Sequence, residues 1–173
     1  MRRRAHHLLL GAAVAGLALT AVSGATAADK YLIVPGQSIG PVKIGSTQIQ
    51  VSRAWGAPNS KKKMGKVASW RWGTAVPLNH PRVVLFLKTG PGSPTAGAVS
   101  TGDMLFHTAE GITPRQSSTA DVLAAYPTAT CDDTEGVCRL VGPAGRLTTF
   151  SLTDGENPSD PKLVIEITVG KGG

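Results

Sequence analysis

The sequence has 173 residues, of which 17% are charged, and a formal net charge of +7 from 18 basic and 11 acidic residues. The charge is uneven: residues 28–107 hold 10 Lys and Arg against 2 acids, whereas residues 108–173 hold 5 against 9. The acidic second half argues against a nucleic-acid partner. Outside the first residues there is no apolar run near the roughly 20 residues that a spanning helix needs, so we predict no membrane span.

The first 27 residues have the pattern of a secretory signal peptide. Three arginines at 2–4 precede the uncharged apolar run 8–22, and small residues lead to the A-x-A sequence at 25–27. We therefore predict cleavage near Ala27 and a secreted, extracellular mature chain. Loss of the three arginines leaves 15 basic residues, so the mature net charge is 15 − 11 = +4.

The segment 44–58, IGSTQIQVSRAWGAP, predicts a short helix. Thr47 is a favoured N-cap residue, and Gln50 three places later completes a capping box. A Gly and a Pro then end the helix. The apolar residues fall at helical spacing on one face, which must pack on another element because so short a helix is unstable alone: Val51, Ala54 and Trp55.

The densest basic segment follows this helix. Residues 60–66, SKKKMGK, place four lysines in what we predict to be a loop: Lys61, Lys62, Lys63 and Lys66. The loop is either an ordinary solvated charge run or a contact for an anionic partner such as a cell-wall polymer.

Three β-rich runs come next, at 69–76, 82–89 and 96–106, and turns separate them. In the first run Trp70 and Trp72 alternate onto one face of the strand, with Arg71 on the other. The tryptophans either form a protein-binding face together with Arg71 or belong to the core. Aromatic side chains suit both, because they supply rigid contact area at interfaces and fill interiors.

A shift of 71 residues aligns Thr47 with Ser118, Val51 with Val122 and Trp55 with Tyr126, so 116–129 predicts a second capped helix. Three further β-rich runs follow it, at 138–142, 146–153 and 162–170. The predicted fold class is therefore α+β. Two tandem helix-plus-antiparallel-meander repeats, 28–107 and 108–173, form one sheet with helices on one face, in one compact domain. We expect four aromatic residues in its core: Trp55, Phe86, Tyr126 and Phe150.

The two cysteines, Cys131 and Cys138, predict one disulfide in an exported chain, as a cross-strand link at a hairpin. The acids between them lack the spacing of an EF-hand. We therefore predict no metal and no cofactor.

The pattern G-S-T-x-x-x-V-x-x-x-W-G-x-P at 45–58 resembles the opening of small bacterial envelope proteins of the SmpA/OmlA type. Two such units in tandem are similar to the β-lactamase-inhibitory proteins, a resemblance that implies a concave, aromatic-rich sheet surface presented to a target enzyme. The sequence departs from that family in several ways. Cysteines occur only in the second unit, Ser46 stands at the usual Met position, and Gln116 stands where the second copy would have glycine.

No motif points to catalysis. The mature chain keeps His80 and His107, but it has no G-x-S-x-G elbow and no cluster of ligands for a catalytic zinc. We therefore expect a secreted non-enzymatic binding protein, an inhibitor or sequestering module that acts on an extracellular protein through the open sheet face. The alternative is a cell-envelope or cell-wall-associated structural or assembly protein held by its basic loop. The sequence names no partner and no oligomeric state.

Overall fold

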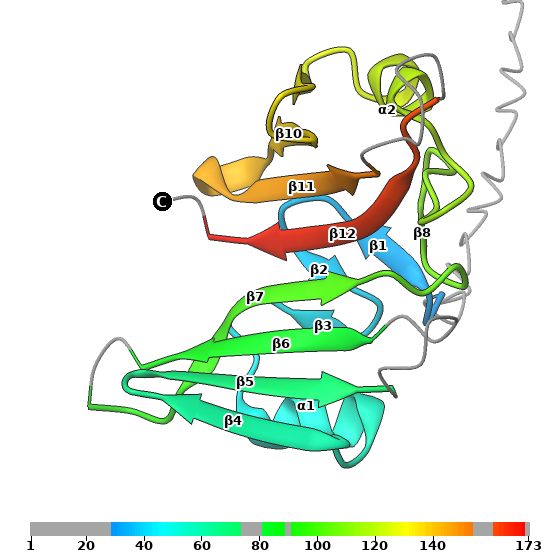
Figure 1. Cartoon of the computed structure of the whole chain (residues 1–173). Coiled ribbons are helices and arrows are strands. Elements are labelled where there is room, and N and C mark those ends of the chain that lie inside the picture. Colours follow the sequence, from blue (N-terminus) through cyan, green and yellow to red (C-terminus); the bar gives the residue numbers. More distant parts are fainter. Residues whose placement is uncertain (1–28, 74–80, 89–90, 154–160, 172–173) are drawn as a thin grey trace, which may run out of the picture.

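The computed structural model describes residues 29–73, 81–88, 91–153 and 161–171 (Figure 1). The signal peptide predicted for residues 1–27 lies outside this part of the chain. Within the described ranges, neither helix has the length and apolar character needed to cross a membrane.

The larger of two sheets has eight strands in the order β4-β5-β6-β7-β12-β11-β10-β9, and every neighbouring pair is antiparallel. Two four-stranded meanders meet at its centre, where β7 pairs with β12. The first meander comprises β4 (Ser60–Met64), β5 (Val67–Trp72), β6 (Arg82–Leu87) and β7 (Thr95–Thr101). The second comprises β9 (Thr130–Asp132), β10 (Val137–Val141), β11 (Leu147–Leu152) and β12 (Val164–Gly170), with a 3₁₀ turn at Pro143–Gly145.

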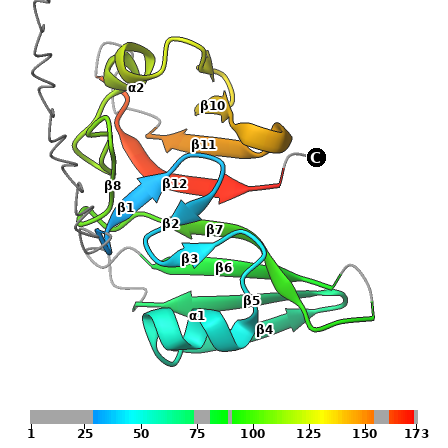
Figure 2. The same ribbon diagram turned by 180° about the vertical axis from the view of Figure 1, so that it is seen from behind.

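The smaller sheet has four short strands in the order β3-β2-β1-β8. They are β1 (Leu32–Val34), β2 (Ser38–Ile39), β3 (Val42–Lys43) and β8 (His107–Thr108), and β8 runs parallel to β1. Figures 1 and 2 together show β1, β2 and β3 behind the middle of the large sheet, on the side where α1 lies. The small sheet therefore covers the centre of one face of the large sheet.

Two short helices complete that covering layer, α1 (Gln48–Trp55) and α2 (Thr119–Ala125). Both predicted capping boxes are present: Thr47 caps α1 together with Gln50, and Ser118 caps α2 together with Asp121. A backbone bridge just before each helix ties its N-terminus to the large sheet. In α1 the partner is Thr95 at the start of β7, and in α2 it is Leu163 beside β12.

The core lies between the large sheet and this covering layer. Aromatic side chains dominate its first half, where Trp55 packs edge-on against Trp72 with ring centroids 5.3 Å apart, and Trp70 against Phe86 at 4.9 Å. In the second half Tyr126 stacks on Phe150. Phe86, Tyr126 and Phe150 are buried, and Trp55 is partly buried against the core, as the sequence predicts.

The structure corrects the predicted fold class. Strands make up 45% of the structure and helices 14%, arranged in two sheets, so the protein is mainly β and is not a pair of helix-plus-meander repeats forming one sheet. The prediction failed because it missed the small sheet, whose strands have only two or three residues each. It also interpreted 60–66 as a loop, whereas residues 60–64 form the edge strand β4.

Candidate functional site

The paired tryptophans of β5 point into the core. Trp70 is 8% exposed and Trp72 3%, and the indole N–H of Trp72 donates to the carbonyl of Gly56 at 3.1 Å, beyond the end of α1. Of the two interpretations open at the level of sequence, burial in the core is the one that the structure shows. Trp70 and Trp72 are therefore not available as a binding face, whereas Arg71 between them points to the opposite, exposed side of the sheet.

That opposite side, which we call the open face, is the side of the large sheet turned away from α1 and the small sheet, and the described residues place no helix on it (Figure 1). Residues directly opposite each other in a sheet share a face, so the strand register identifies its members. Starting from Arg71, the register leads to Val83 on β6, Ser100 on β7 and Thr168 on β12. Small polar side chains therefore occupy the middle of the open face.

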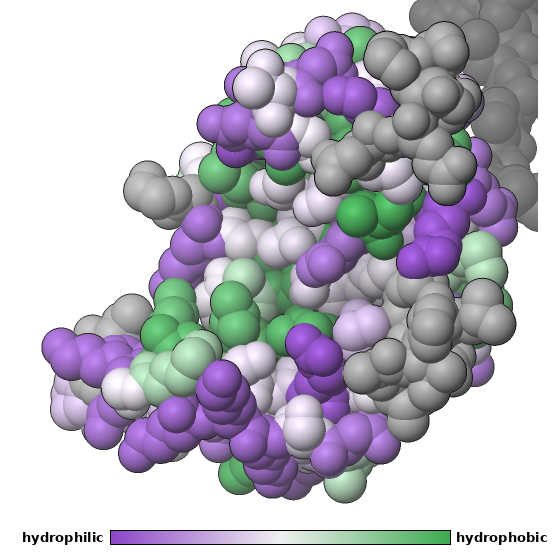
Figure 3. All heavy atoms as spheres, viewed as in Figure 1, coloured by the Kyte–Doolittle hydropathy of each residue, from purple (hydrophilic) through white to green (hydrophobic). Residues whose placement is uncertain are grey.

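An apolar area covers the part of the open face formed by β4, β5 and β6. We call it the aliphatic patch; it consists of Met64, Val67, Val83, Leu85 and Leu87. Leu85 is 36% exposed and Met64 51% exposed. Figure 3 shows this area as a group of hydrophobic side chains with hydrophilic ones around it. Exposed contiguous apolar surface is a usual mark of an interaction site.

A hollow of about 290 Å³ lies beside the aliphatic patch, where β5, β6, β7 and β12 run side by side. Arg71 and Glu166 contribute its charged groups, and it is lined further by Val83, Leu85, Ala98, Ser100 and Thr168. Arg71 makes no ion pair with any described residue. Its guanidinium is therefore free to bind a carboxylate of a partner, which is the geometry that a planar guanidinium suits best.

The lysines predicted as a basic loop lie on a two-stranded hairpin at the edge of the large sheet. All five residues of β4 are exposed, and the turn into β5 uses Gly65 with a φ of 58°. Alternation along β4 divides the lysines between the two faces. Lys61 and Lys63 lie opposite Trp70 and Ala68 and so point to the side of α1, whereas Lys62 lies opposite Ser69 and points to the open face.

The charge of this hairpin is not neutralised nearby. Residues 30–102 include ten Lys and Arg and no acidic residue. Within the described ranges, none of the hairpin lysines forms an ion pair. Lys61 instead makes a cation–π contact: its ammonium lies 4.4 Å from the ring centroid of Trp70. This end of the molecule therefore presents a positive field on both faces of the sheet.

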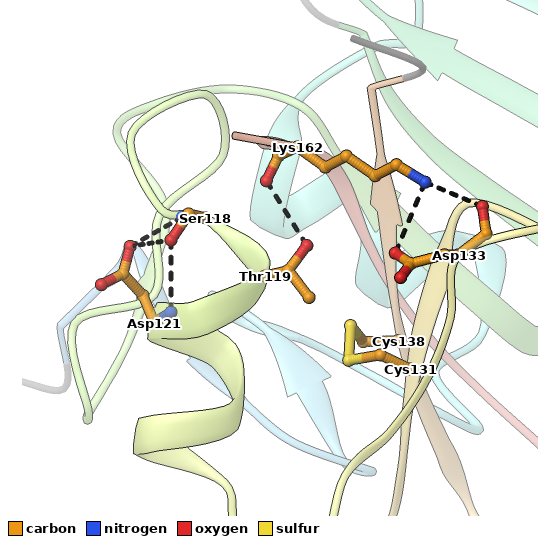
Figure 4. The surroundings of a disulfide bond; sticks show 7 residues. All are labelled: Ser118, Thr119, Asp121, Cys131, Asp133, Cys138 and Lys162. Atoms are coloured by element: carbon orange, nitrogen blue, oxygen red, sulfur yellow. Dashed lines mark hydrogen bonds and ion pairs between the residues drawn. A yellow bond between two sulfur atoms is a disulfide. The ribbon is translucent and has the colours of Figure 1, made fainter. Parts of the chain in front are cut away.

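The predicted disulfide is present. Cys131 on β9 and Cys138 on β10 are bonded and lie directly opposite each other, so the bond links the outermost strand to its neighbour, as predicted. Figure 4 shows Lys162 beside it, with its ammonium 2.8 Å from the carbonyl of Asp133 and its own carbonyl 3.5 Å from the hydroxyl of Thr119 on α2. Lys162 thereby connects α2, the β9–β10 turn and the start of β12.

Metal-binding side chains do not gather in the part of the chain that the structure describes. No group of three His, Cys, Asp or Glu side chains there is arranged to hold a metal ion. His107 pairs with Asp29 at 3.2 Å, on the surface where β1 and β8 meet. His80 lies outside the described residues.

Comparison with known proteins does not identify a family for this chain. No family model, curated protein or solved structure matches the chain. The resemblance to the SmpA/OmlA-type envelope proteins and the β-lactamase-inhibitory proteins therefore stays a prediction from residues 45–58.

Proposed function

We propose that the chain is a non-enzymatic binding protein that works outside the cytoplasm and holds another protein on its open face. The aliphatic patch carries this proposal. Among the described residues, no helix or strand covers its five neighbouring apolar side chains, and the cationic side chain beside them has no ion-pair partner. The disulfide supports an oxidising compartment, where such bonds form and persist.

The charges around the patch indicate what kind of protein would fit it. Lys62 lies at the edge strand on the open face, and Arg71 lies at the other side of the patch. A partner surface with an apolar centre and carboxylates at its rim would bury the aliphatic side chains and pair with these cations. Such complementarity raises the association rate and selects against partners with basic rims.

Paired variants test the open face. Capture from the extracellular fraction of the source culture would supply a candidate, which is then purified and titrated against the full mature chain. Leu85→Glu combined with Arg71→Glu is expected to weaken binding at least about tenfold, the scale of an interface hot spot. Val141→Glu is the control for the Leu85→Glu part of this change: it places a glutamate at an exposed apolar residue on β10, at the far end of the same face, and is expected to leave affinity unchanged. Equal affinities for all three proteins would refute the open face as the site.

A second function has its own supporting observation, the unneutralised hairpin. We infer that Lys61, Lys63 and Lys66 of this hairpin can hold the protein on an anionic cell-wall polymer, since a cluster of exposed cations without acidic neighbours attracts polyanions. Binding of the mature chain to isolated cell-wall material is then expected to vanish in about 1 M salt, where the Debye length is about 3 Å. Retention at that salt concentration would argue against this function.

A further inference from the structure

Two hollows lie along the hairpin, and Val67 is the one member of the aliphatic patch that also lines either of them. The first, of about 410 Å³, lies between α1 and the hairpin and is lined by Gln48, Ile49, Ser52, Arg53, Lys61 and Trp70. The second, of about 270 Å³, lies at the hairpin turn and is lined by Lys63, Gly65, Lys66, Val67, Ala68, Lys88 and Pro94.

The two hollows are neighbours along one strand. Lys61 lines the first and Lys63 the second, and both point to the same side of β4 because they are two residues apart. Their Cα atoms are therefore about 7 Å apart along the strand. We call the combined surface the basic furrow. It follows an exposed edge strand, so an extended chain could lie along it.

Five cations line the basic furrow and no acid does: Arg53, Lys61, Lys63, Lys66 and Lys88. None of the five makes an ion pair with a described residue. Four of the five are lysines. An ammonium binds phosphate as a point charge, whereas the planar fork of arginine suits carboxylate and phosphate alike. The lysine-rich furrow therefore suits spaced phosphate charges, and a carboxylate polymer is the alternative that the test below examines.

The groups between the cations are suited to a polyol or sugar. Gln48 and Ser52 offer hydrogen-bonding side chains to hydroxyl groups, and Ile49, which is 65% exposed, offers an apolar surface to the carbon backbone of a repeat unit. The furrow lacks what a single-stranded nucleic acid uses, a bare aromatic ring for base stacking. Trp70 is only 8% exposed, and the ammonium of Lys61 lies over its ring.

We propose that the basic furrow binds a linear polymer of phosphodiester-linked polyol or sugar units, with consecutive phosphates held by the cations of the two hollows. This rests on the second function proposed above and gives it a site and a ligand class. The cations of the furrow are separate from those of the open face, because β4 directs Lys61 and Lys63 to one side and Lys62 to the other.

The test uses two variants of the full mature chain that lose the same charge on opposite faces. Lys61→Ala/Lys63→Ala removes two cations from the furrow, and Lys62→Ala/Arg71→Ala removes two from the open face. Affinity is measured by calorimetry for poly(glycerol phosphate), with polygalacturonate and single-stranded oligothymidylate as carboxylate and nucleic-acid probes. All four replaced side chains are exposed, so folding is expected to be unaffected and is checked by thermal unfolding.

The expected result is a loss of roughly tenfold or more in affinity for poly(glycerol phosphate) in the furrow variant, about the size of two lost phosphate contacts, and a loss under about threefold in the open-face variant. Equal losses in both variants would overturn the proposal, since they would show unspecific attraction by net charge. Polygalacturonate or oligothymidylate binding as tightly as the phosphate polymer would overturn the ligand class. Failure of the second proposed function itself is seen separately, as absent binding of the unaltered protein to isolated cell wall.

Discussion

At the scale of single residues, Tyr126 is a buried polar group whose hydroxyl has a charged partner. It ends α2, stacks on Phe150 and donates its phenolic hydrogen to the exposed carboxylate of Glu110. Burial, reinforced by this hydrogen bond, raises the pKa of Tyr126 above its ordinary value. The hydrogen bond from Tyr126 lowers the pKa of Glu110. The hydrogen bond between Tyr126 and Glu110 therefore makes the stability of the α2 region depend on pH both in acid and in alkali.

Tyr126→Phe is expected to lower the free energy of unfolding at neutral pH by about 1 kcal/mol, the net value of a typical hydrogen bond. The pKa of Glu110 is lower in the folded state, so its contribution is present above the unfolded value of about 4.3 and is lost as the pH falls through the folded value. The variant should therefore lose less stability in acid than the unaltered protein does. Urea unfolding between about pH 2 and pH 7 measures this difference, with Tyr31→Phe as the matched control. An unchanged acid response would contradict the role of Glu110.

At alkaline pH, stability changes with pH in the opposite direction. The pKa of Tyr126 is higher in the folded state, so its contribution is complete below the unfolded value of about 10 and is lost as the pH rises above that value. Stability is expected to fall above about pH 10 in the unaltered protein and to fall less in Tyr126→Phe. Absorbance near 295 nm, where phenolate absorbs, would show one tyrosine titrating only on unfolding. Titration of both tyrosines in the folded protein would rule this out.

At the scale of elements, the helix caps show what local sequence can determine. The hydroxyl of Ser118 accepts from the backbone N–H of Asp121, whose carboxylate accepts from the backbone N–H of Ser118 in return. The backbone hydrogen bond from Ser118 lowers the pKa of Asp121. These contacts span three residues, so a sequence pattern suffices to predict them, and α2 begins at the predicted position.

Ser118→Ala is expected to lower the free energy of unfolding by about 1 kcal/mol, because α2 would lose a satisfied N-terminal amide. Ser118→Asn keeps an N-cap acceptor of similar strength and should stay close to the unaltered protein. Denaturant unfolding of the three proteins gives the comparison. A loss of the same size in Ser118→Asn would show that the site is sensitive to side-chain size and not to capping.

Strand β4 shows where local sequence fails. Three consecutive lysines have low strand propensity, and the segment extends only because β5 supplies hydrogen-bonding partners beside it. The strands of the small sheet escape prediction for a related reason, since sharp turns separate them. At Gly40, with a φ of 53°, an added Cβ would lie 2.3 Å from the carbonyl oxygen of Lys30. Tertiary contacts stabilise β4 and the short strands of the small sheet more than their intrinsic strand propensity does.

The disulfide is the other feature that sequence spacing predicts at this scale. It fastens β9, a three-residue edge strand, to β10. Cys131→Ala/Cys138→Ala is expected to lower the free energy of unfolding by about 2–3 kcal/mol in the chain-entropy model for so small a loop. The unaltered protein is also unfolded under reducing and under oxidising conditions. Reduction breaks the bond without removing the side chains, so it separates the effect of the disulfide from the effect of the lost side-chain volume. Equal stability of the oxidised and reduced protein would contradict this estimate.

At the scale of the whole molecule, the two sheets explain why Trp70 and Trp72, one interpretation of which was a binding face, are buried. Alternation along β5 places Trp70 and Trp72 on one side and Arg71 on the other, and the structure agrees. Alternation cannot tell which side is covered. That depends on α1 and the small sheet, which lie against the side of the tryptophans, so the exposed side is aliphatic and basic and not aromatic. The location of a free surface is thus a property of the assembled layers.

The same assembly joins the two meanders into one cooperative body. Where β7 meets β12, Val99 and Val169 are paired and fully buried, and the covering strands β2 and β3 pack on β7 beside them. Neither meander can separate without exposing this seam to water. We therefore expect unfolding to be a single two-state transition even though the charges of the two halves differ in sign.

Val169→Ala tests the seam. Removal of two buried carbon atoms is expected to lower the free energy of unfolding by roughly 2–3 kcal/mol, from lost burial and the cavity left behind. All three tryptophans lie in the first half, so their fluorescence reports that half, while amide hydrogen exchange in β10 and β11 reports the second. If the two halves unfold together, both signals should report the same loss of unfolding free energy. This holds even though the substituted residue lies on β12 and the fluorescent residues lie on α1 and β5. A shift confined to β10 and β11 would mean that the halves unfold independently, and the open face would then be two surfaces and not one.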